Sequence, residues 1–186
     1  MDRSHALSRL RTGLQKVAGR DLFNVAVTSV PSRRVRRIWL KRILGNLGSS
    51  SSVCLRVRLL EPQGIAIGDR TVIGPDCYLD GRSGLTIESD VDIAPGCHIW
   101  TLEHDPNSPS HGVKGKPVVI RDHVWIASRA TILPGVTIGR GAVVGSGSVV
   151  TSDVGDNEIV AGIPAKTIGR RDNALEYRLS FGGRFR

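Results

Sequence analysis

Histidine is the side chain best suited to proton transfer near neutral pH, and this sequence contains five of them. One of them, His104, stands at a marked break in the chain. A regular six-residue repeat reaches Glu103 and then does not resume until after residue 117. A neutral imidazole, with an ordinary pKa of about 6.5, can accept the proton of a hydroxyl group while that group reacts. His104 is therefore the predicted general base of a catalytic site.

The other histidines are placed less favourably for chemistry. His98 and His123 fall at outward positions of regular repeats, and His5 belongs to a basic segment, so these three are expected at the surface. His111 lies in the irregular stretch that follows His104 and could line the same site.

The element that must position His104 is the repeat itself. Neither the 3.6-residue period of a helix nor the two-residue period of a strand explains a spacing of six, which is typical of a β-solenoid. An aliphatic residue recurs at this spacing in three blocks. It occupies positions Ile67, Ile73, Leu79, Ile87, Ile93, Ile99, Ile120, Ile126, Ile132, Ile138, Val144 and Val150.

The residue four places after each aliphatic position is also restricted. It is small or β-branched everywhere except at Glu103. Each repeat supplies one short strand and one corner of a prism, with the aliphatic residue inside and the small residue at the inner corner. About eighteen residues complete one triangular coil, so the regular repeats predict about four coils. Cys77 and Cys97 occupy inner-corner positions and are predicted to be buried, reduced thiols.

Length and composition fit a single all-β solenoid domain. A chain of 186 residues can bury one sizeable core, and an aromatic share of 4% suits a narrow prism filled by Ile, Val and Ala. No apolar run approaches the roughly 18 residues of a membrane span. Because the N-terminus also lacks the apolar core of a signal peptide, a cytoplasmic location is expected.

The positive charge is concentrated before the solenoid. Residues 1–45 hold 11 of the 26 Lys and Arg but only 2 of the 17 Asp and Glu, so the rest of the chain is neutral overall. Residues 31–44 have the pattern of a capped amphipathic helix. This helix could cover the open end of the solenoid, or it could attract anionic lipid or a polyanionic substrate and make the protein membrane-peripheral. Nucleic-acid binding is not expected, because no such motif is present and no aromatic residues alternate with the charges.

These patterns divide the chain into a basic, mostly helical segment (1–45), a solenoid domain (46–171) and a short tail (172–186). Within the solenoid, residues 105–117 contain three prolines and two glycines, which exclude a helix and predict a loop extruded from the prism. Before the regular repeats, residues 46–66 are expected to form an irregular first coil, in which Val53, Leu55, Val57 and Leu59 alternate as a strand would.

Four motifs follow one another in a fixed order. They are His104-Asp105-Pro106 with the extruded loop, Val124-Trp125-Ile126-Ala127-Ser128, Ile132-Leu133-Pro134-Gly135-Val136-Thr137-Ile138-Gly139, and Val160-Ala161-Gly162-Ile163-Pro164-Ala165-Lys166. Together they resemble the hexapeptide-repeat acetyltransferases, and within these the sugar O-acetyltransferases of the galactoside, maltose, nodulation-factor and exopolysaccharide type. The resemblance covers residues 60–171. It implies a left-handed parallel β-helix, a homotrimer, acetyl-CoA as donor and a hydroxyl acceptor. Because the CoA thiolate is a good leaving group, the transfer is expected to require no metal.

The resemblance also implies roles for individual residues. His104 takes the place of the family's catalytic histidine, and Glu103 could lie near its imidazole. The expected acetyl-CoA contacts are Trp125, Ala127 and Ser128 along the pantetheine arm, Ser146 in the next coil, Ile163, Pro164 and Lys166 near the adenine, and Arg170 and Arg171 at the phosphates. Trp125 could instead pack against a neighbouring subunit, and the two arginines could belong to a solvated tail.

Fewer sequence features indicate which residues bind the acceptor. Asp80 matches a position at which related sugar acetyltransferases carry a polar side chain, often Asn. The further candidates are Arg82, Trp100, Asn107 and His111. In the family the cleft lies between subunits, so His104 and Trp125 would act from different chains.

The leading prediction is an acetyl-CoA-dependent O-acetyltransferase that modifies a sugar hydroxyl of a surface polysaccharide or glycolipid precursor. The alternatives are another CoA-dependent acyltransferase, acting on serine, an amino sugar or an antibiotic, and a non-enzymatic solenoid scaffold. A zinc site of His98, His104 and His123, as in solenoid carbonic anhydrases, is not expected, because the close histidine pair of that family is missing.

Overall fold

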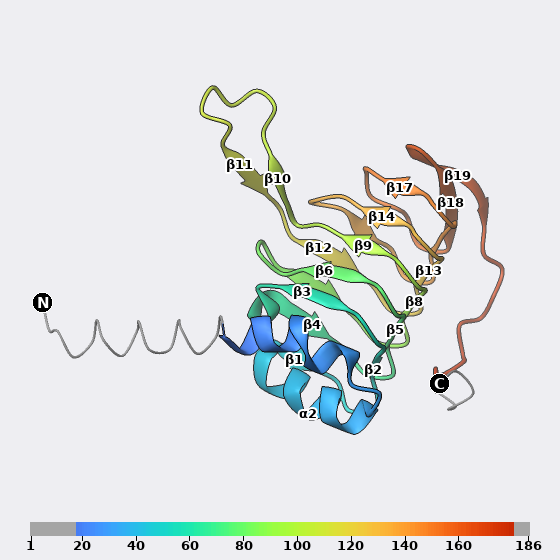
Figure 1. The fold of residues 1–186 in the computed structure, drawn as a ribbon. Coiled ribbons are helices and arrows are strands. Elements are labelled where there is room, and N and C mark those ends of the chain that lie inside the picture. The colour runs from blue at the N-terminus through green and yellow to red at the C-terminus, as the bar shows by residue number, and fades with distance from the viewer. Residues whose placement is uncertain (1–17, 181–186) are drawn as a thin grey trace, which may run out of the picture.

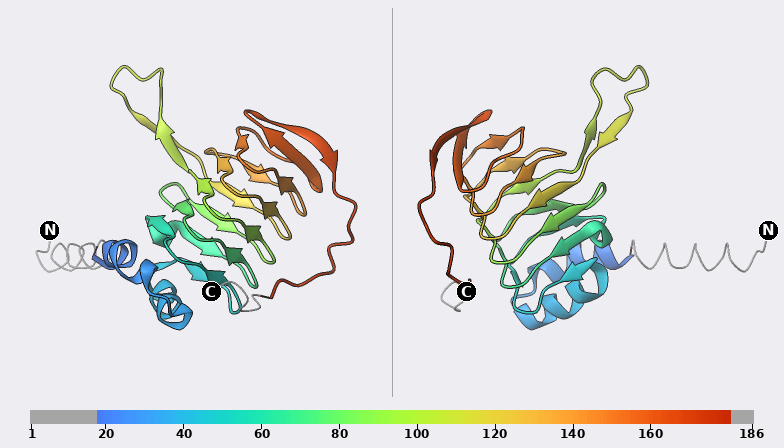
Figure 2. Two further views of the ribbon diagram at one scale, coloured as in Figure 1. Left: turned by 45° about the vertical axis from the view of Figure 1, so that its right-hand side comes forward. Right: turned by 180° about the vertical axis from the view of Figure 1, so that it is seen from behind.

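The computed structural model describes residues 18–180 and shows a triangular prism of stacked short strands with helices at one end (Figures 1 and 2). Predictions that concern residues 1–17 and 181–186, including the placement of His5, lie outside the described residues.

Three sheets of stacked strands form the faces of the prism, and within the solenoid the paired strands are parallel. The first face consists of β1 (Asn46–Leu47), β4 (Ile65–Ile67), β7 (Leu85–Ile87), β12 (Val118–Ile120) and β15 (Thr137–Ile138). The second face consists of β2 (Ser52–Val53), β5 (Val72–Ile73), β8 (Asp92–Ile93), β13 (Trp125–Ile126), β16 (Val143–Val144) and β18 (Glu158–Gly162), to which β19 (Ala165–Arg170) adds an antiparallel edge. The third face consists of β3 (Arg58–Leu60), β6 (Tyr78–Asp80), β9 (His98–Ile99), β14 (Thr131–Ile132) and β17 (Val149–Val150).

The six-residue period sets the register of every face. Ile73 pairs with Ile93 and Ile93 with Ile126, so each inward residue lies on its equivalent in the next coil. All three of these side chains are fully buried, which identifies the stacked aliphatic column as the core of the fold. The strands form five coils and β18 begins a sixth, so the predicted β-solenoid is confirmed. The left-handed form is what the resemblance to hexapeptide-repeat acetyltransferases implies.

The inner corners are filled as predicted. Thr71, Cys77 and Cys97 are buried there, and both thiols are free. The hydroxyl of Thr71 donates to the Glu88 carbonyl at 2.7 Å and accepts from the Val91 N–H at 3.2 Å, so this buried polar group is satisfied.

The first coil differs from the prediction. The segment expected to alternate as one strand forms two strands, β2 and β3, separated by a turn in which Arg56 adopts a left-handed conformation with φ 55°. Val53 pairs with Ile73 and Leu59 with Leu79, so the first coil already follows the six-residue period. The alternating apolar residues are therefore two inward positions, an inner corner and a turn. The strand-like alternation was a wrong interpretation, and the first coil is more regular than predicted.

The N-terminal end of the prism is covered by helices. Residues 18–25 are helical, η1 (Val27–Ser29) follows, and α2 (Arg33–Ile43) lies across β1 and β2 (Figure 1). The side chain of Ser32 caps α2 by accepting from the Val35 N–H, and Leu40 and Ile43 face the core. Arg36 is buried and donates to the carbonyls of Val30 and Val53, and burial lowers the pKa of its guanidinium.

Two further segments leave the regular coils. The short helix η2 (Pro62–Gly64) links the first coil to the second. After β19, the chain runs back along the prism toward the end that carries the helices (Figure 2). This tail is fixed to the corner between the first and second faces, because the Leu179 N–H donates to Asp90 at 2.9 Å and Leu175 is buried.

Candidate active site

His104 lies on a two-stranded ribbon that projects from the prism. The ribbon pairs β10 (Leu102–His104) with β11 (Val113–Gly115) in antiparallel fashion, and His104 is opposite Val113 (Figure 1). It leaves the solenoid between β9 of the third face and β12 of the first face. The extruded loop of the prediction is therefore present, but it is a hairpin that begins at Leu102.

The imidazole of His104 is oriented by the residue at the far end of the hairpin loop. Its Nδ1 lies 3.0 Å from the backbone carbonyl oxygen of His111, and the two rings are stacked with centroids 3.9 Å apart. A carbonyl oxygen only accepts hydrogen bonds, so Nδ1 carries the proton in this contact. The neutral ring then has its lone pair on Nε2, which is the form that a general base requires.

Glu103 does not orient the imidazole. Successive side chains of a strand point to opposite sides, and the Glu103 carboxylate lies 3.5 Å from the Lys114 ammonium on the neighbouring strand. Lys114 also lies 3.9 Å from the carboxylate of Asp105. Both pairs are substantially exposed, so they contribute little to stability. Asn107 is exposed at the start of the loop, where its N–H donates to Asp105.

Asp80 is buried beneath the base of the hairpin. Its carboxylate forms a two-pronged ion pair with the Arg82 guanidinium at 2.9 and 3.0 Å and also accepts from the Thr101 N–H at 3.0 Å. Burial acts to raise the pKa of Asp80, but these hydrogen bonds outweigh it and hold the pKa below its ordinary value. Arg82 reaches the Leu102 carbonyl at 3.4 Å. The structure thus gives Asp80 a positioning role: it holds Arg82, which is partly exposed, against the hairpin that carries His104.

Trp100 belongs to an aromatic cluster on the outer side of the third face. Its ring centroid lies 4.9 Å from that of Tyr78 and 6.1 Å from that of His98. Tyr78 belongs to β6 and His98 to β9, and Trp100 comes two residues before Leu102, where the hairpin begins. His98 is exposed at this surface, as predicted.

The predicted donor residues gather at another corner. Trp125 faces outward from the second face with 46% of its surface exposed, and Ala127 is almost buried. At the corner that follows β13, a hollow of about 460 Å³ is lined by Pro95, Ser128, Arg129, Ser146 and Gly147. Two side chains predicted to contact acetyl-CoA, those of Ser128 and Ser146, therefore line one hollow.

The residues predicted for the nucleotide end of CoA lie at the C-terminal edge. Ile163 and Pro164 form the exposed turn between β18 and β19, and Lys166 is exposed on β19. Arg170 donates to the Asp156 carbonyl at 3.0 Å.

Arg171 is held away from this turn. Its guanidinium donates to the carbonyls of His123 and Gly141 at 3.0 and 3.3 Å and to the hydroxyl of Tyr177 at 3.0 Å. These bonds fix the tail along the corner between the first and second faces, and His123 stacks edge-on against Tyr177 there. His123 was predicted to be a surface residue, but the tail partly covers it.

Within one chain, the predicted general base His104 and the predicted donor residue Trp125 lie on opposite sides of the prism. In a triangular prism, the second face lies opposite the edge between the third and first faces. Trp125 points outward from that face, whereas the His104 hairpin leaves from that edge. A single chain therefore does not bring the imidazole of His104 to the indole of Trp125.

Asp92 is a candidate residue of the active site that the sequence analysis did not identify. It pairs in register with Trp125 on the outer side of the second face and is half-buried. Among residues 18–180 its carboxylate has no hydrogen bond or ion pair, and burial raises its pKa. Polar residues are common at outward positions of a solenoid, so the sequence alone offered no signal. Within the described residues, no group of three or more potential ligands could hold a metal ion.

Comparison with known proteins identifies the family. The family model described as bacterial transferase hexapeptide (six repeats) matches residues 117–152. Nodulation protein L of Rhizobium meliloti (strain 1021) is 35% identical over 181 residues, which cover 86% of this chain and 99% of that protein. The chain therefore belongs to the hexapeptide-repeat acetyltransferases.

Two solved structures of this family show the same fold. A hexapeptide-repeat acetyltransferase of Vibrio cholerae, in complex with acetyl coenzyme A, is 30% identical with a TM-score of 0.77, and the match covers 92% of each chain. A galactoside acetyltransferase in complex with coenzyme A is 29% identical with a TM-score of 0.76, over 84% of this chain and 79% of that one. No helix within residues 18–180 is long and apolar enough to cross a membrane.

Proposed function

We propose that the protein transfers the acetyl group of acetyl-CoA to a sugar hydroxyl of a surface polysaccharide or glycolipid precursor, with His104 as the general base. The observation that carries this proposal is the contact of His104 Nδ1 with the His111 carbonyl, which leaves the lone pair on Nε2. The likeness to a galactoside acetyltransferase supports a sugar as acceptor. The likeness to an acetyl-CoA complex supports the donor.

The proposed reaction needs no covalent enzyme intermediate. Nε2 of His104 takes the proton of the acceptor hydroxyl while the oxygen attacks the thioester carbonyl carbon. The tetrahedral intermediate collapses, the carbon–sulfur bond breaks, and the CoA thiolate takes the proton back from the imidazolium. The products are an acetyl ester and free CoA.

The proposed site lies between two copies of the chain. His104 of one copy meets Trp125, Ser128 and Ser146 of the next, because one chain holds these groups on different sides of the prism. Three copies around one axis would form three equivalent sites, which is the homotrimer of the proposal.

The activity is tested by measuring CoA release from acetyl-CoA with a panel of sugars, amino sugars and serine. The proposal expects release with a sugar that has a free hydroxyl and formation of an ester that is labile to base. It expects the same rate after treatment with a chelator. An amide product from an amino sugar, or turnover with serine alone, would instead support another class of acyltransferase.

The shared site is tested by mixing two impaired variants and assaying them at a low acetyl-CoA concentration, at which a tenfold weaker affinity leaves Trp125→Ala with about a tenth of wild-type activity. His104→Ala and Trp125→Ala subunits, unfolded and reassembled together, should form mixed trimers in which roughly a quarter of the sites have both native residues. Activity should then return to a corresponding fraction of wild type. A monomer in sedimentation at micromolar concentration, or no recovery in assembled mixtures, would refute the shared site.

A further inference from the structure

The N-terminal helices expose an unusual combination of side chains. On α2, the outer stripe consists of Arg34, Val35, Ile38, Lys41 and Arg42, which lie on one side of the helix because they are spaced three or four residues apart. Val35 and Ile38 are 46% and 55% exposed. We call these five residues the α2 stripe.

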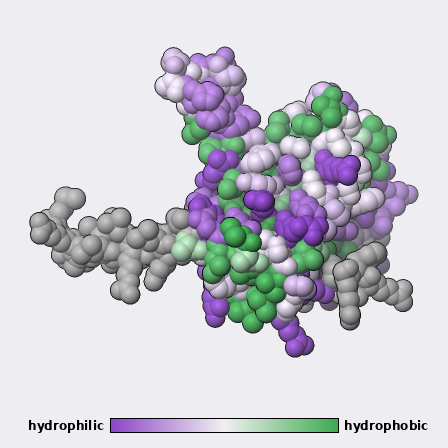
Figure 3. All heavy atoms as spheres, viewed as in Figure 1, coloured by the Kyte–Doolittle hydropathy of each residue, from purple (hydrophilic) through white to green (hydrophobic). Residues whose placement is uncertain are grey.

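The preceding helix adds to the apolar surface. Leu22 and Val25 are exposed there, and the indole N–H of Trp39 donates to the Gly19 carbonyl, which fixes this helix against α2. Four of the eight large hydrophobic side chains exposed in the described chain thus belong to the two N-terminal helices. Figure 3 shows apolar residues gathered over this end of the molecule beside strongly polar ones. Exposed aliphatic residues concentrated at one end indicate a binding surface.

The cations of the α2 stripe have no ion-pair partner among residues 18–180. The side chains of Arg34, Lys41 and Arg42 form no hydrogen bond or ion pair within that part of the chain. Asp21 is the one acidic residue between positions 18 and 45, and it pairs with Arg20. The surface is therefore strongly positive and attracts anionic partners.

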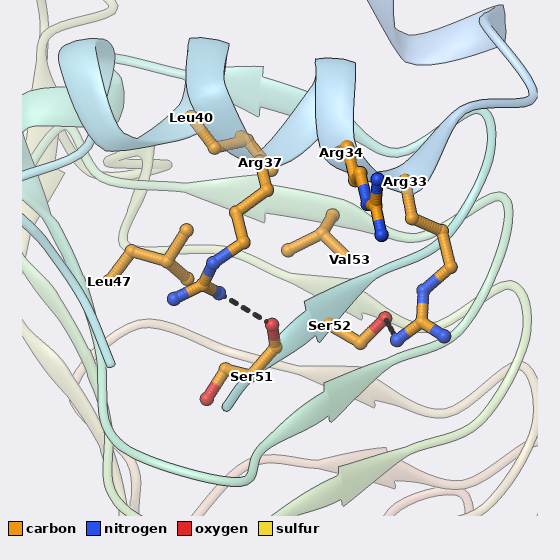
Figure 4. A pocket seen from close by; sticks show the side chains of 8 residues that line it. All are labelled: Arg33, Arg34, Arg37, Leu40, Leu47, Ser51, Ser52 and Val53. Carbon is orange, nitrogen blue, oxygen red and sulfur yellow. Dashed lines mark hydrogen bonds between the residues drawn. The ribbon is translucent and has the colours of Figure 1, made fainter. Parts of the chain in front are cut away.

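A pocket beneath the stripe is also basic. Arg33, Arg34 and Arg37 lie over Ser51 and Ser52 around a volume of about 350 Å³ (Figure 4). Arg37 donates to the carbonyls of Ser51 and Gly48, so it is part of the fold, whereas Arg34 is exposed at the rim. The pocket extends the positive surface from the helix onto the first coil.

We propose that this N-terminal surface docks on an anionic lipid membrane. Lys and Arg side chains near such a membrane are attracted to its headgroups, while aliphatic side chains beside them enter the interface. A soluble polyanion would neutralise the cations but would leave Val35, Ile38, Leu22 and Val25 in water. Charge and apolar exposure together therefore favour a membrane over a nucleic acid.

The test measures co-sedimentation of the full chain with vesicles of phosphatidylcholine alone and with vesicles that also contain phosphatidylglycerol. Wild type should bind the anionic vesicles, and binding should weaken as salt is raised. Each membrane-facing cation contributes about fivefold to partitioning, so Arg34→Ala with Lys41→Ala and Arg42→Ala should weaken it roughly a hundredfold. The matched control is Arg58→Ala with Arg140→Ala and Arg178→Ala, three exposed arginines elsewhere, which should retain nearly wild-type binding.

A second variant, Val35→Ser with Ile38→Ser, separates the membrane from other partners. Because two aliphatic side chains no longer enter the interface, it should weaken vesicle binding by roughly tenfold or more and leave the oligomeric state unchanged. Absence of binding by wild type at low salt, or equal binding to neutral vesicles, would overturn the proposal. So would an equal loss in the control variant. If the apolar variant keeps full vesicle affinity, the surface is a general polyanion site; if it dissociates the assembly, the surface is a subunit contact, and either result overturns the membrane proposal.

Discussion

His104 is held by its neighbour in space, His111, through a backbone atom as well as through ring stacking. The Nδ1 atom of His104 lies 3.0 Å from the His111 carbonyl oxygen, and the two rings are 14° from parallel. This arrangement gives the imidazole both an orientation and a defined tautomer without a carboxylate partner. The chemistry of His104 consequently depends on the conformation of the loop between the two residues.

The role of His111 can be separated from that of His104 by substitution. His111 has a left-handed backbone with φ 53°, a conformation that asparagine tolerates better than alanine. His111→Asn keeps the carbonyl but removes the stacked ring, so turnover should fall by no more than about tenfold, far less than for loss of the base itself. Steady-state kinetics with a working acceptor would measure this. A loss as large as that of His104→Ala would make His111 the base.

Substitution of the two residues of β13 should affect different properties, stability for Ile126 and acetyl-CoA binding for Trp125. Ile126 is fully buried in the aliphatic column, so Ile126→Ala should lower the free energy of unfolding by about 2–5 kcal/mol. Trp125 points outward, so Trp125→Ala should change protomer stability by less than about 1 kcal/mol. It should instead weaken acetyl-CoA binding roughly tenfold, the loss expected for one aromatic contact. Denaturant unfolding and calorimetric titration test the pair, and unchanged CoA affinity in Trp125→Ala would remove the indole from the donor site.

Asp92 should make stability depend on pH. Burial raises its pKa in the folded state, so folding is favoured when the carboxyl is protonated. This contribution is fully present below the unfolded pKa and is lost as pH rises through the folded pKa, where a half-buried ionised carboxylate must be tolerated. Asp92→Asn should therefore match wild type in acid and become more stable than wild type toward neutral pH.

Thermal unfolding across that pH range measures the effect in Asp92→Asn. Asp172→Asn removes an exposed carboxylate of the tail and serves as the control for net charge. A variant that is less stable than wild type at neutral pH would show that Asp92 makes a favourable interaction as the ion.

The repeat could be predicted from the sequence because its spacing is a direct consequence of the fold. Ile73, Ile93 and Ile126 stack in register, so each position is restricted by its neighbours along the axis. The regularity of the first coil was missed because the interval from Leu59 to Ile67 is eight residues, which hides the same period in Val53 and Leu59.

The site could be predicted only in part. His104 is conspicuous because it stands where the repeat stops, but its orienting group is a main-chain carbonyl that has no signal in the side-chain sequence. Arg171 has the residue type expected of a phosphate contact. Its actual partners, the His123 and Gly141 carbonyls and Tyr177, come together only when the tail folds back along the prism.

The most direct test of the account is the effect of His104→Ala on turnover and on acetyl-CoA affinity, measured in the same preparation. A positioned general base is worth about 10²–10⁴-fold in rate, so kcat should fall within that range. Calorimetric titration should show nearly unchanged acetyl-CoA binding, because the imidazole meets only the acceptor hydroxyl and the reacting carbonyl, whereas binding is spread along the pantetheine arm and the phosphates of CoA. The assembly should also persist, since His104 is exposed on a hairpin outside the stacked core. Turnover close to wild type, or loss of acetyl-CoA binding together with activity, would contradict the assignment of His104 as the base.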